Sequence, residues 1–432
     1  MRLPGRLSAA IAVLEDVELR HRPAAEALKG WGINNRFAGA GDRAAIGNLV
    51  YDALRHKASH AHVMGDASPR ALVLAVAVRD WGHDPAALNA LFEGDAHAPA
   101  PLTEAEIGRL TQADPLAGAP DHVRADVPEW LVPNLAANFG DGWVAEAEAM
   151  NQRPPLDLRV NTLKSTREKV ARALHRFSPQ ETGPAAEGLR LPAGGEDART
   201  PNVQSDEGYL KGWFEVQDQG SQMVALLAGA RSGEQVLDLC AGAGGKTLAM
   251  AASMNNKGQI FAYDSERSRL APIYDRLKRN GVRNAQVRPP EAGALDDLVG
   301  KLDRVVIDAP CTGTGTWRRR PDTKWKLTPE QLAQRVAEQK AILDQGATFV
   351  KPGGQLAYIT CSILAEENGE QVESFLAAHP DFEVVPANKL WHTHFSGSTA
   401  RAKFSEEGGI ALSPLKTGTD GFYIAVLARK KS

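Results

Sequence analysis

The chain has 432 residues, 43% hydrophobic and 24% charged, a composition typical of a soluble globular protein with two or three domains. Its formal net charge of −3 excludes a strongly basic nucleic-acid binder, so any surface for nucleic acid must be local. Three cysteines are too few for a disulfide framework, and no apolar run is long enough to cross a bilayer. We therefore expect a cytoplasmic protein with no membrane partner.

Helical patterns fill residues 1–140, which we predict to form one all-α domain. Apolar spacing predicts a helix over 42–56 with Asp42 as its N-cap, and further helices near 7–14, 69–81, 85–92 and 127–139. His56, His60 and His62 are close in sequence but have no Cys or carboxylate partner at ligand spacing. We interpret them as packed or solvated side chains and predict no metal.

The pattern changes after the Arg-Pro-Pro run at 153–155. Residues 156–163 alternate like a strand, and 188–192 form a second short strand within a Gly, Pro and acid-rich patch at 179–206. Residues 165–177 look helical, with Ser165 as N-cap and Glu168 in the capping-box position. We predict a linker and a small α+β subdomain over residues 141–213.

Strands and helices alternate from residue 214 to residue 432. Strands are expected at 235–239, 259–264, 303–308, 355–360 and 421–427, and helices at 248–252, 265–280 and 328–350. This alternation predicts an α/β domain with a mostly parallel, doubly wound sheet, whose ligands bind outside the carboxyl ends of the strands. The strand-end residues Cys240, Asp264, Asp308 and Cys361 would then share one rim.

The turn after the first of these strands is rich in glycine and runs from Cys240 to Lys246. A phosphate-binding P-loop would need glycine at Cys240, and a dinucleotide fingerprint would need its third glycine at Thr247. The remaining interpretations are a plain structural turn or a site for a ligand without a pyrophosphate, such as S-adenosylmethionine. Asp264 fits a hydrogen bond to ribose, an N-cap for the next helix, or both.

A second loop, Asp308-Ala-Pro-Cys-Thr-Gly-Thr-Gly, places a carboxylate three residues from the thiol of Cys311. Five cations and two indoles follow between Trp317 and Lys326. Such a run is usually a solvated face, but cations can hold phosphates while aromatic rings stack on unpaired bases. Beside a candidate active-site loop we favour nucleic-acid binding, through Arg318, Arg319, Arg320, Lys324 and Trp325.

Cys361 ends the strand at 355–360, just before a helix that Glu366-Glu-Asn368 opens. A thiol near a helix N-terminus tends to have a lowered pKa, which suits a nucleophile. A lone cysteine is more often a small buried apolar residue. Two thiols and a carboxylate on one rim favour the nucleophile.

These motifs resemble those of the Nop/Sun-type RNA cytosine-5 methyltransferases, in particular the bacterial 16S ribosomal RNA methyltransferase B group. The resemblance covers about residues 150–430 and rests on 237–247, 308–325 and 360–368, in that order. It implies a Rossmann-like class I S-adenosylmethionine-dependent methyltransferase domain, preceded by a small RRM-like α+β insert and a NusB-like RNA-binding helical domain.

The resemblance also implies roles for individual residues. Cys361 would attack C6 of a cytosine in RNA, Asp308 would hydrogen-bond the base near N3, Cys311 would assist release, and Lys246 would orient Asp308. The implied cofactor site comprises Cys240, Ala241, Gly242, Ala243, Gly244, Gly245, Lys246, Asp264, Glu291 and Asp308. Two departures stand out. Gly242-Ala243 replaces the family's Ala-Pro, and the family's usual aspartate after the third strand is missing, with Glu291 as the nearest acid.

Other functions remain open at this stage. DNA cytosine methyltransferases also carry a Pro-Cys loop, with that cysteine as the nucleophile, which here would be Cys311. A non-catalytic RNA-binding protein of ribosome assembly is a further alternative, although the intact thiols and Asp308 disfavour it. By resemblance we expect a monomer acting on ribosomal RNA, with transfer RNA as the alternative substrate.

Overall fold

The computed structural model describes residues 1–195 and 198–431, and the chain divides into two compact units. The helical unit comprises Met1–Pro154, Ala193–Thr200 and Trp317–Lys326, and the sheet unit comprises Pro155–Pro192, Pro201–Thr316 and Leu327–Ser432. The division differs from the predicted boundaries at 140 and 213. The helical unit extends further along the chain and includes the cationic segment Trp317–Lys326.

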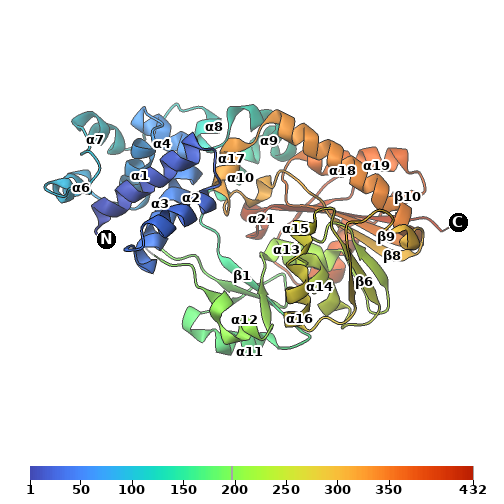
Figure 1. The fold of residues 1–432 in the computed structure, drawn as a ribbon. Coiled ribbons are helices and arrows are strands. Elements are labelled where there is room, and N and C mark those ends of the chain that lie inside the picture. Colours follow the sequence, from blue (N-terminus) through green and yellow to red (C-terminus); the bar gives the residue numbers. More distant parts are fainter. Residues whose placement is uncertain (196–197, 432) are drawn as a thin grey trace. The chain divides into compact units, whose positions relative to one another are not determined.

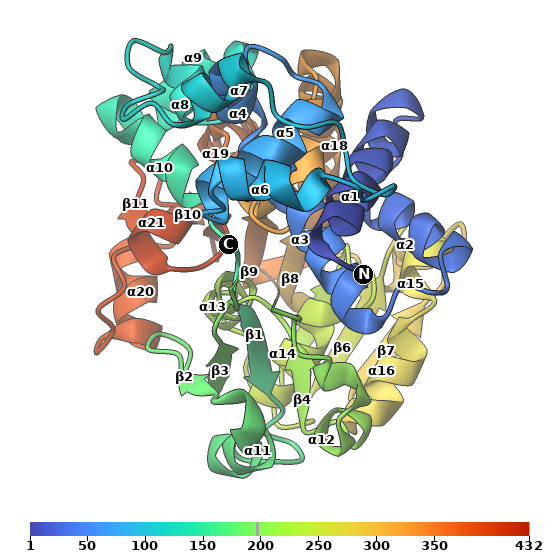
Figure 2. The same cartoon turned by 90° about the vertical axis from the view of Figure 1, so that its left-hand side faces the viewer.

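The helical unit is built around three helices that pack side by side, α1 (Leu3–Leu19), α3 (Ala40–Arg55) and α5 (Pro69–Ala75) (Figure 2). Asp42 is the third residue of α3 and not its N-cap. Its carboxylate accepts the N–H of Gly39, which caps the helix. The other helices of the unit are α2 (Ala24–Asn34), α4 (Lys57–Met64), α6 (Pro85–Phe92), α7 (Glu104–Leu110), α8 (Asp121–Arg124), α9 (Val132–Phe139), α10 (Trp143–Ala149) and α17 (Pro321–Lys326).

The sheet unit contains a small antiparallel sheet of four strands in the order β2-β3-β1-β4. Its strands are β1 (Leu156–Val160), β2 (Gln180–Glu181), β3 (Gly188–Leu191) and β4 (Phe214–Val216). The helix α11 (Arg167–Ala173) begins one residue later than predicted, because Thr166 and not Ser165 accepts the capping N–H. A further short helix, α12 (Glu207–Leu210), precedes β4.

Hydrogen bonds from buried side chains join this small sheet to the rest of the sheet unit. Glu215 on β4 is 2% exposed and accepts hydrogen bonds from Arg276 and Asn280 in the helix Ile273–Asn280. Arg190 on β3 binds Asp157 through two nitrogens and also donates to the carbonyl of Gly418. The small sheet is therefore fixed against the large one.

The large sheet has nine strands, with eight in the order β11-β12-β13-β9-β8-β5-β6-β7 and β10 paired to β13 (Figure 1). Strands β7, β6, β5, β8 and β9 are parallel, whereas β13, β12, β11 and β10 add antiparallel pairs. The sheet is thus mixed, not mostly parallel. The strands are β5 (Gln235–Asp238), β6 (Gln259–Tyr263), β7 (Ala285–Arg288), β8 (Leu302–Asp308), β9 (Val350–Thr360), β10 (Phe382–Val384), β11 (Lys403–Phe404), β12 (Ile410–Leu412) and β13 (Phe422–Arg429).

Two apolar cores flank the large sheet because successive side chains on a strand point to opposite faces. Val236 joins the core lined by Met250, whereas its neighbour Leu237 joins the core lined by Leu343. The predicted helix over 265–280 is broken at Ala271-Pro272 into two shorter helices. The helices of this unit are α13 (Gln219–Leu227), α14 (Gly245–Ser253), α15 (Arg267–Leu270), α16 (Ile273–Asn280), α18 (Pro329–Phe349), α19 (Gly369–Ala378), α20 (Ala387–Phe395) and α21 (Pro414–Thr417).

The strand order reverses between β5 and β8. The chain proceeds from β5 outward to β6 and β7, and then returns to place β8 and β9 on the other side of β5. Ligands of open α/β sheets bind at such a reversal, beyond the carboxyl ends of the strands. Within the described part of the chain, no helix combines the length and apolar character needed to span a bilayer.

Candidate functional site

The glycine-rich turn between β5 and α14 has the backbone that its sequence predicts. Gly242 and Gly244 have backbone φ angles of 48° and 85°, which residues other than glycine rarely adopt. A Cβ on Gly244 would lie 2.6 Å from Ile273, whereas a Cβ on Gly245 would meet no atom within 4 Å. The turn thus packs tightly beneath Gly244 and leaves open space beside Gly245, at the first residue of α14.

Asp264 follows β6 and holds this turn. One of its carboxylate oxygens accepts the N–H of Gly242 at 2.9 Å and the other accepts the N–H of Glu266 at 2.9 Å. The N-cap interpretation is wrong, because α15 begins at Arg267 after Glu266 and has no side-chain cap. Asp264 is 2% exposed, so its first role is to shape the turn.

Asp238, the last residue of β5, lies beneath the same turn with none of its surface exposed. One carboxylate oxygen accepts the hydroxyl of Thr247 at 2.6 Å, and the other has no hydrogen-bond partner. Burial raises the pKa of Asp238 to about 7, and the hydrogen bond from Thr247 only partly offsets it. Desolvation also raises the pKa of Cys240, the half-buried residue that opens the turn.

Lys246 reaches from α14 to the end of β8. Its ammonium donates to Asp308 Oδ2 at 3.0 Å and to the hydroxyl of Ser221 on α13 at 2.9 Å. Lys246 is 6% exposed, whereas Asp308 is 34% exposed. The ion pair therefore joins a buried ammonium to a carboxylate that stays partly exposed at the end of β8.

The two cysteines of the rim come together. Cys311 Sγ and Cys361 Sγ are 3.3 Å apart, although fifty residues separate them in sequence. The loop Ala309–Thr316, here the Cys311 loop, follows β8, and the segment Cys361–Asn368, here the Cys361 loop, follows β9. The N–H of Ala309 donates to the carbonyl of Ile359, so β8 and β9 remain paired up to the thiols.

The pKa of Cys311 is raised well above its ordinary value. The hydrogen bond with Cys361 is the largest cause that raises the pKa of Cys311, and desolvation by burial is the second. Cys311 is therefore protonated at neutral pH. A protonated thiol beside a second sulfur is suited to donate a proton to it.

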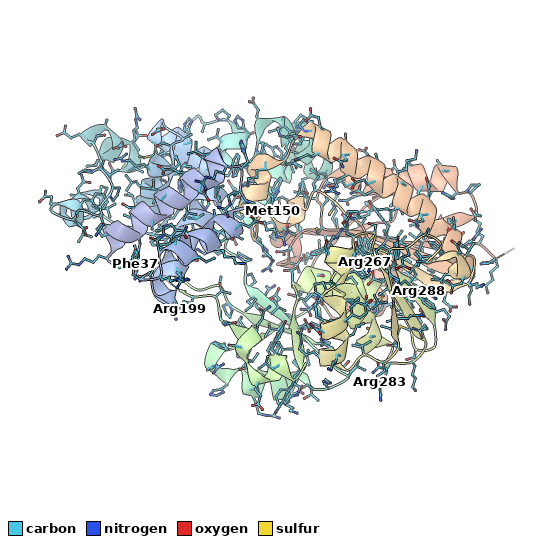
Figure 3. All side chains as sticks on the ribbon, viewed as in Figure 1. Phe37, Met150, Arg199, Arg267, Arg283 and Arg288 are labelled. Atoms are coloured by element: carbon cyan, nitrogen blue, oxygen red, sulfur yellow. The ribbon has the colours of Figure 1, made fainter. Side chains whose placement is uncertain are left out.

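Glu291 lies beyond β7 and is largely exposed. Its carboxylate is 3.4 Å from the guanidinium of Arg267, at the start of α15. Arg267 is itself 73% exposed, and Figure 3 marks its place on the sheet unit. Glu291 thus lies near the rim of the sheet but is not fixed there by any buried contact in the described structure.

The cationic segment Trp317–Lys326 folds into the helical unit. Lys324 is 1% exposed and donates to the carbonyl of Arg55 and to Asn151 Oδ1, and its burial lowers its pKa to about 8. The indole of Trp325 donates to the carbonyl of Leu54 at 2.6 Å and packs on the helical core. This burial argues against RNA contacts by Lys324 and Trp325.

The arginines of the segment differ in exposure. Arg318 is 5% exposed, and its carbonyl accepts a hydrogen bond from Arg55. Arg319 is half-buried, whereas Arg320 is exposed. Arg320 is therefore the best placed of the predicted RNA-contacting side chains to meet a phosphate.

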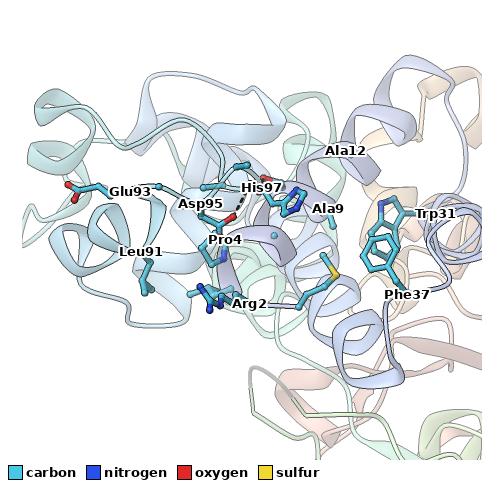
Figure 4. Close-up of a pocket in the computed structure, with 17 residues that line it drawn as sticks. Arg2, Pro4, Ala9, Ala12, Trp31, Phe37, Leu91, Glu93, Asp95 and His97 are labelled. Carbon is cyan, nitrogen blue, oxygen red and sulfur yellow. Dashed lines mark hydrogen bonds between the residues drawn. The ribbon is translucent and has the colours of Figure 1, made fainter.

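Two of the three histidines noted in the helical unit, His56 and His60, pair with separate carboxylates. His56 contacts Asp126 at 3.4 Å and His60 contacts Asp80 at 3.3 Å, so they do not converge on one point. A cavity of about 1030 Å³ lies elsewhere in this unit, lined by residues including Trp31, Phe37 and His97 (Figure 4). It belongs to the helical unit and contains none of the predicted catalytic residues.

Two protein-family models match parts of this chain, and the longer match contains the glycine-rich turn and both thiols. Residues 225–428 match the family described as 16S rRNA methyltransferase RsmB/F, and residues 127–195 match the ferredoxin-like domain of RsmF/B-like methyltransferases. The chain belongs to the RsmB/F family. Ribosomal RNA small subunit methyltransferase B of Klebsiella pneumoniae is 36% identical over 310 residues, which are 71% of this chain and 66% of that relative.

A second curated relative and two solved structures are also similar to this chain. The probable ribosomal RNA small subunit methyltransferase B of Synechocystis is 35% identical over 70% of this chain and 66% of its own length. The crystal structure of PH0851 covers 99% of both chains, with 25% identity and a TM-score of 0.73. A methyltransferase homologue from Pyrococcus horikoshii covers 72% of this chain and 97% of its own, with 27% identity and a TM-score of 0.58.

Several residues of the site carry no recognisable sequence signal. Ser221 lies in an unremarkable helix, and only the fold brings its hydroxyl to Lys246. Asp238 is one acid within an apolar strand, a pattern that could have drawn attention because an acid in a buried strand requires a partner. The sequence around Glu367 indicates only the opening of a helix, yet its carboxylate accepts the N–H of Thr312 in the Cys311 loop.

Proposed function

We propose that this protein transfers a methyl group from S-adenosylmethionine to C5 of a cytosine in RNA, through a covalent adduct between Cys361 and C6. The observation that carries the proposal is the thiol pair, with sulfurs 3.3 Å apart at the carboxyl ends of β8 and β9. Asp308, fixed by Lys246 at 3.0 Å, lies at the end of the same strand pair. These groups match the steps that cytosine methylation needs.

C5 of cytosine is a poor nucleophile until another group adds at C6. The Cys361 thiolate would form that bond, while Asp308 hydrogen-bonds the base near N3 and stabilises the adduct. C5, now enamine-like, accepts a methyl group. Loss of the C5 proton and expulsion of the Cys361 thiolate then restore the aromatic ring.

The geometry of the pair is consistent with a role for Cys311 in release. Its hydrogen bond with Cys361 and its burial raise the pKa of Cys311, so its thiol can act as a proton donor. The sulfur of Cys311 is 3.3 Å from that of Cys361, close enough to assist the departure of the Cys361 thiolate. We assign attack to Cys361 and release to Cys311.

The turn from Cys240 to Lys246 is the proposed cofactor site, and S-adenosylmethionine would supply the methyl group there. The open space beside Gly245 fits close approach of a ligand to the backbone. The first turn of α14 adds unpaired N–H groups, and Asp264, Asp308 and the rim residue Glu291 complete the acidic side of the site. Asp264 acts mainly by holding the turn open.

The substrate is proposed to be RNA, and ribosomal RNA in particular, because the named relatives are ribosomal RNA methyltransferases. The target base must be unpaired or flipped out of its stack to reach the thiols. Arg320, with Arg318 and Arg319 beside it, is the proposed phosphate contact. We expect the protein to act as a monomer in a reducing compartment such as the cytoplasm.

The test uses purified protein, labelled S-adenosylmethionine and RNA from cells that lack the gene. Wild-type protein is expected to label C5 of one cytosine. Cys361→Ala should be inactive, and Cys311→Ala should accumulate a covalent protein–RNA adduct that survives denaturation. Sequencing of the labelled RNA then identifies the substrate as ribosomal or transfer RNA.

Two results would overturn the proposal. If Cys361→Ala still forms the adduct and Cys311→Ala does not, the nucleophile is Cys311 and the assigned roles are reversed. If no RNA accepts label although S-adenosylmethionine binds, the protein acts on another substrate or has only a binding function.

A further inference from the structure

The thiol pair is held by one short turn that follows β9. The turn Ala365–Glu367 is a 3-10 helix, and Asn368 comes immediately after it. Glu367 is 0% exposed and Asn368 is 5% exposed. Buried polar side chains of this kind stay buried only when hydrogen bonds satisfy them, so their partners are informative.

Glu367 binds the Cys311 loop. Its carboxylate accepts both the backbone N–H of Thr312, at 2.8 Å, and the hydroxyl of the same residue. Gln339 on α18 donates to the same carboxylate at 2.9 Å and also donates to the carbonyl of Pro310 at 3.0 Å. The residues on both sides of Cys311 are therefore tied, directly or through Gln339, to Glu367.

Asn368 binds the other side of the pair. Its amide oxygen accepts the hydroxyl of Thr360, and its amide nitrogen donates to the carbonyl of Ser362 at 3.0 Å. Thr360 and Ser362 are the two neighbours of Cys361. Two consecutive side chains thus fix the neighbours of both cysteines.

We infer that Glu367 and Asn368 are positioning residues, Glu367 for the releasing thiol Cys311 and Asn368 for the attacking thiol Cys361. Neither residue touches the reacting atoms in this arrangement. Each acts through the loop it holds, and together they set the separation of the two sulfurs. The roles of release and attack rest on the proposed function, whereas the hydrogen bonds that hold the two loops do not depend on it.

Substitutions of Glu367 and Asn368 should affect different steps of the reaction. Glu367→Met keeps the length of the side chain but removes all three accepted hydrogen bonds, which frees the Cys311 loop. We expect adduct to form and then persist, as in Cys311→Ala, with turnover reduced at least about 10-fold, since small misplacements of reacting groups have effects of this size. Asn368→Leu should instead slow adduct formation, without accumulation.

Conservative variants separate positioning from a general structural role. Glu367→Gln keeps an acceptor for the Thr312 N–H and can donate to its hydroxyl, so near wild-type turnover is expected. Thr312→Val removes only the hydroxyl bond and should give a smaller effect in the same direction as Glu367→Met. Glu370→Met, at an exposed position on the adjoining helix α19, is the matched control.

A second measurement needs no RNA. Diamide takes up two electrons and two protons as two thiols become a disulfide, and the rate of Cys311–Cys361 disulfide formation can be followed by mass spectrometry. We expect Glu367→Met and Asn368→Leu to slow this rate several-fold and Glu370→Met to leave it unchanged. The oxidation rate depends on how often the two sulfurs come within bonding distance, and it does not depend on the identity of the substrate.

The outcomes separate the two proposals. If wild type methylates RNA and Cys311→Ala traps adduct, but Glu367→Met turns over and oxidises like wild type, the positioning role is wrong and the proposed function stands. If no variant traps adduct, the proposed function fails. The diamide rates still decide whether the turn holds the thiols, and equal rates in all variants would overturn that as well.

Discussion

Cys311 and Cys361 show how strongly one residue can depend on its neighbour. Each sulfur is the other's hydrogen-bond partner, and this bond is the largest cause of the raised pKa of Cys311. Burial adds to the effect. The acid–base behaviour of Cys311 is therefore a property of the pair and not of the Cys311 loop alone.

Removing one thiol should change the reactivity of the other. In Cys361→Ala the pKa of Cys311 is expected to fall, because its main cause is lost while burial remains. Alkylation of Cys311 by iodoacetamide at pH 8 should then be several-fold faster than in wild type. Mass spectrometry of the peptide that contains Cys311, across pH 7 to 10, measures this, and an unchanged pH profile would contradict it.

Asp238 predicts a pH dependence of stability. Its pKa in the folded protein is about 7, above its ordinary value of 3.8, so folding takes up a proton between these pH values. Its contribution to stability is full below about pH 4 and is lost as the pH rises to about 7. A shift of this size corresponds to at most about 4 kcal/mol.

The variant Asp238→Asn cannot titrate and should lack this loss. We expect the Tm of wild type to fall relative to that of Asp238→Asn between pH 5 and pH 8, measured by calorimetry in one buffer series. Asp275→Asn, at an exposed position in the same unit, is the control. Parallel Tm curves for wild type and Asp238→Asn would show that Asp238 is charged in the fold.

At the scale of elements, two adjacent glycines of the glycine-rich turn have different roles, one in stability and one in the proposed ligand binding. Gly244 has a φ of 85° and no room for a Cβ, which would lie 2.6 Å from Ile273. Gly245 has an ordinary φ and open space. Adjacent glycines in one turn therefore serve different purposes.

Alanine at each position tests this difference. Gly244→Ala should lower the Tm by several degrees, since a strained φ and a close contact typically cost about 1–3 kcal/mol. Gly245→Ala should keep the wild-type Tm and weaken S-adenosylmethionine binding, measured by titration calorimetry. A Gly245→Ala protein with unchanged affinity would place the cofactor away from this part of the turn.

Local sequence patterns predicted the elements of the sheet unit better than the contacts of the cationic segment. The strands β5, β8 and β9, which lead to Cys240, Asp308 and Cys361, follow from apolar runs and turn residues, whose effect is local. Lys324 looked like an RNA ligand because lysine is usually solvated. Its burial depends on Asn151 and Arg55, distant residues that no local spacing reveals.

For the whole molecule, the division into two units limits which fragments can fold. Trp317–Lys326 belongs to the helical unit although it lies between β8 and α18 in sequence. Trp317 is 1% exposed and is among the largest fully buried side chains. A fragment of residues 155–432 would retain the glycine-rich turn but lose the partners of this segment.

We expect this fragment to bind S-adenosylmethionine yet to expose an apolar surface. Its fluorescence with 8-anilinonaphthalene-1-sulfonate should rise above that of the full chain, and trypsin should cleave rapidly within Arg318-Arg319-Arg320. The full chain under the same conditions is the reference. Equal resistance to trypsin would mean that the segment keeps its fold without residues 1–154.

The helical unit is assembled from three separate stretches of the chain, and this bears on how such a gene can evolve. A crossover at residue 154 would join a foreign α3 to the resident α17, although these two helices contact each other within one core. The interior of one unit is thus encoded on both sides of the motif that contains Cys311. Lineages should consequently exchange the whole gene and not its first third, and substitutions in α3 and α17 should co-vary.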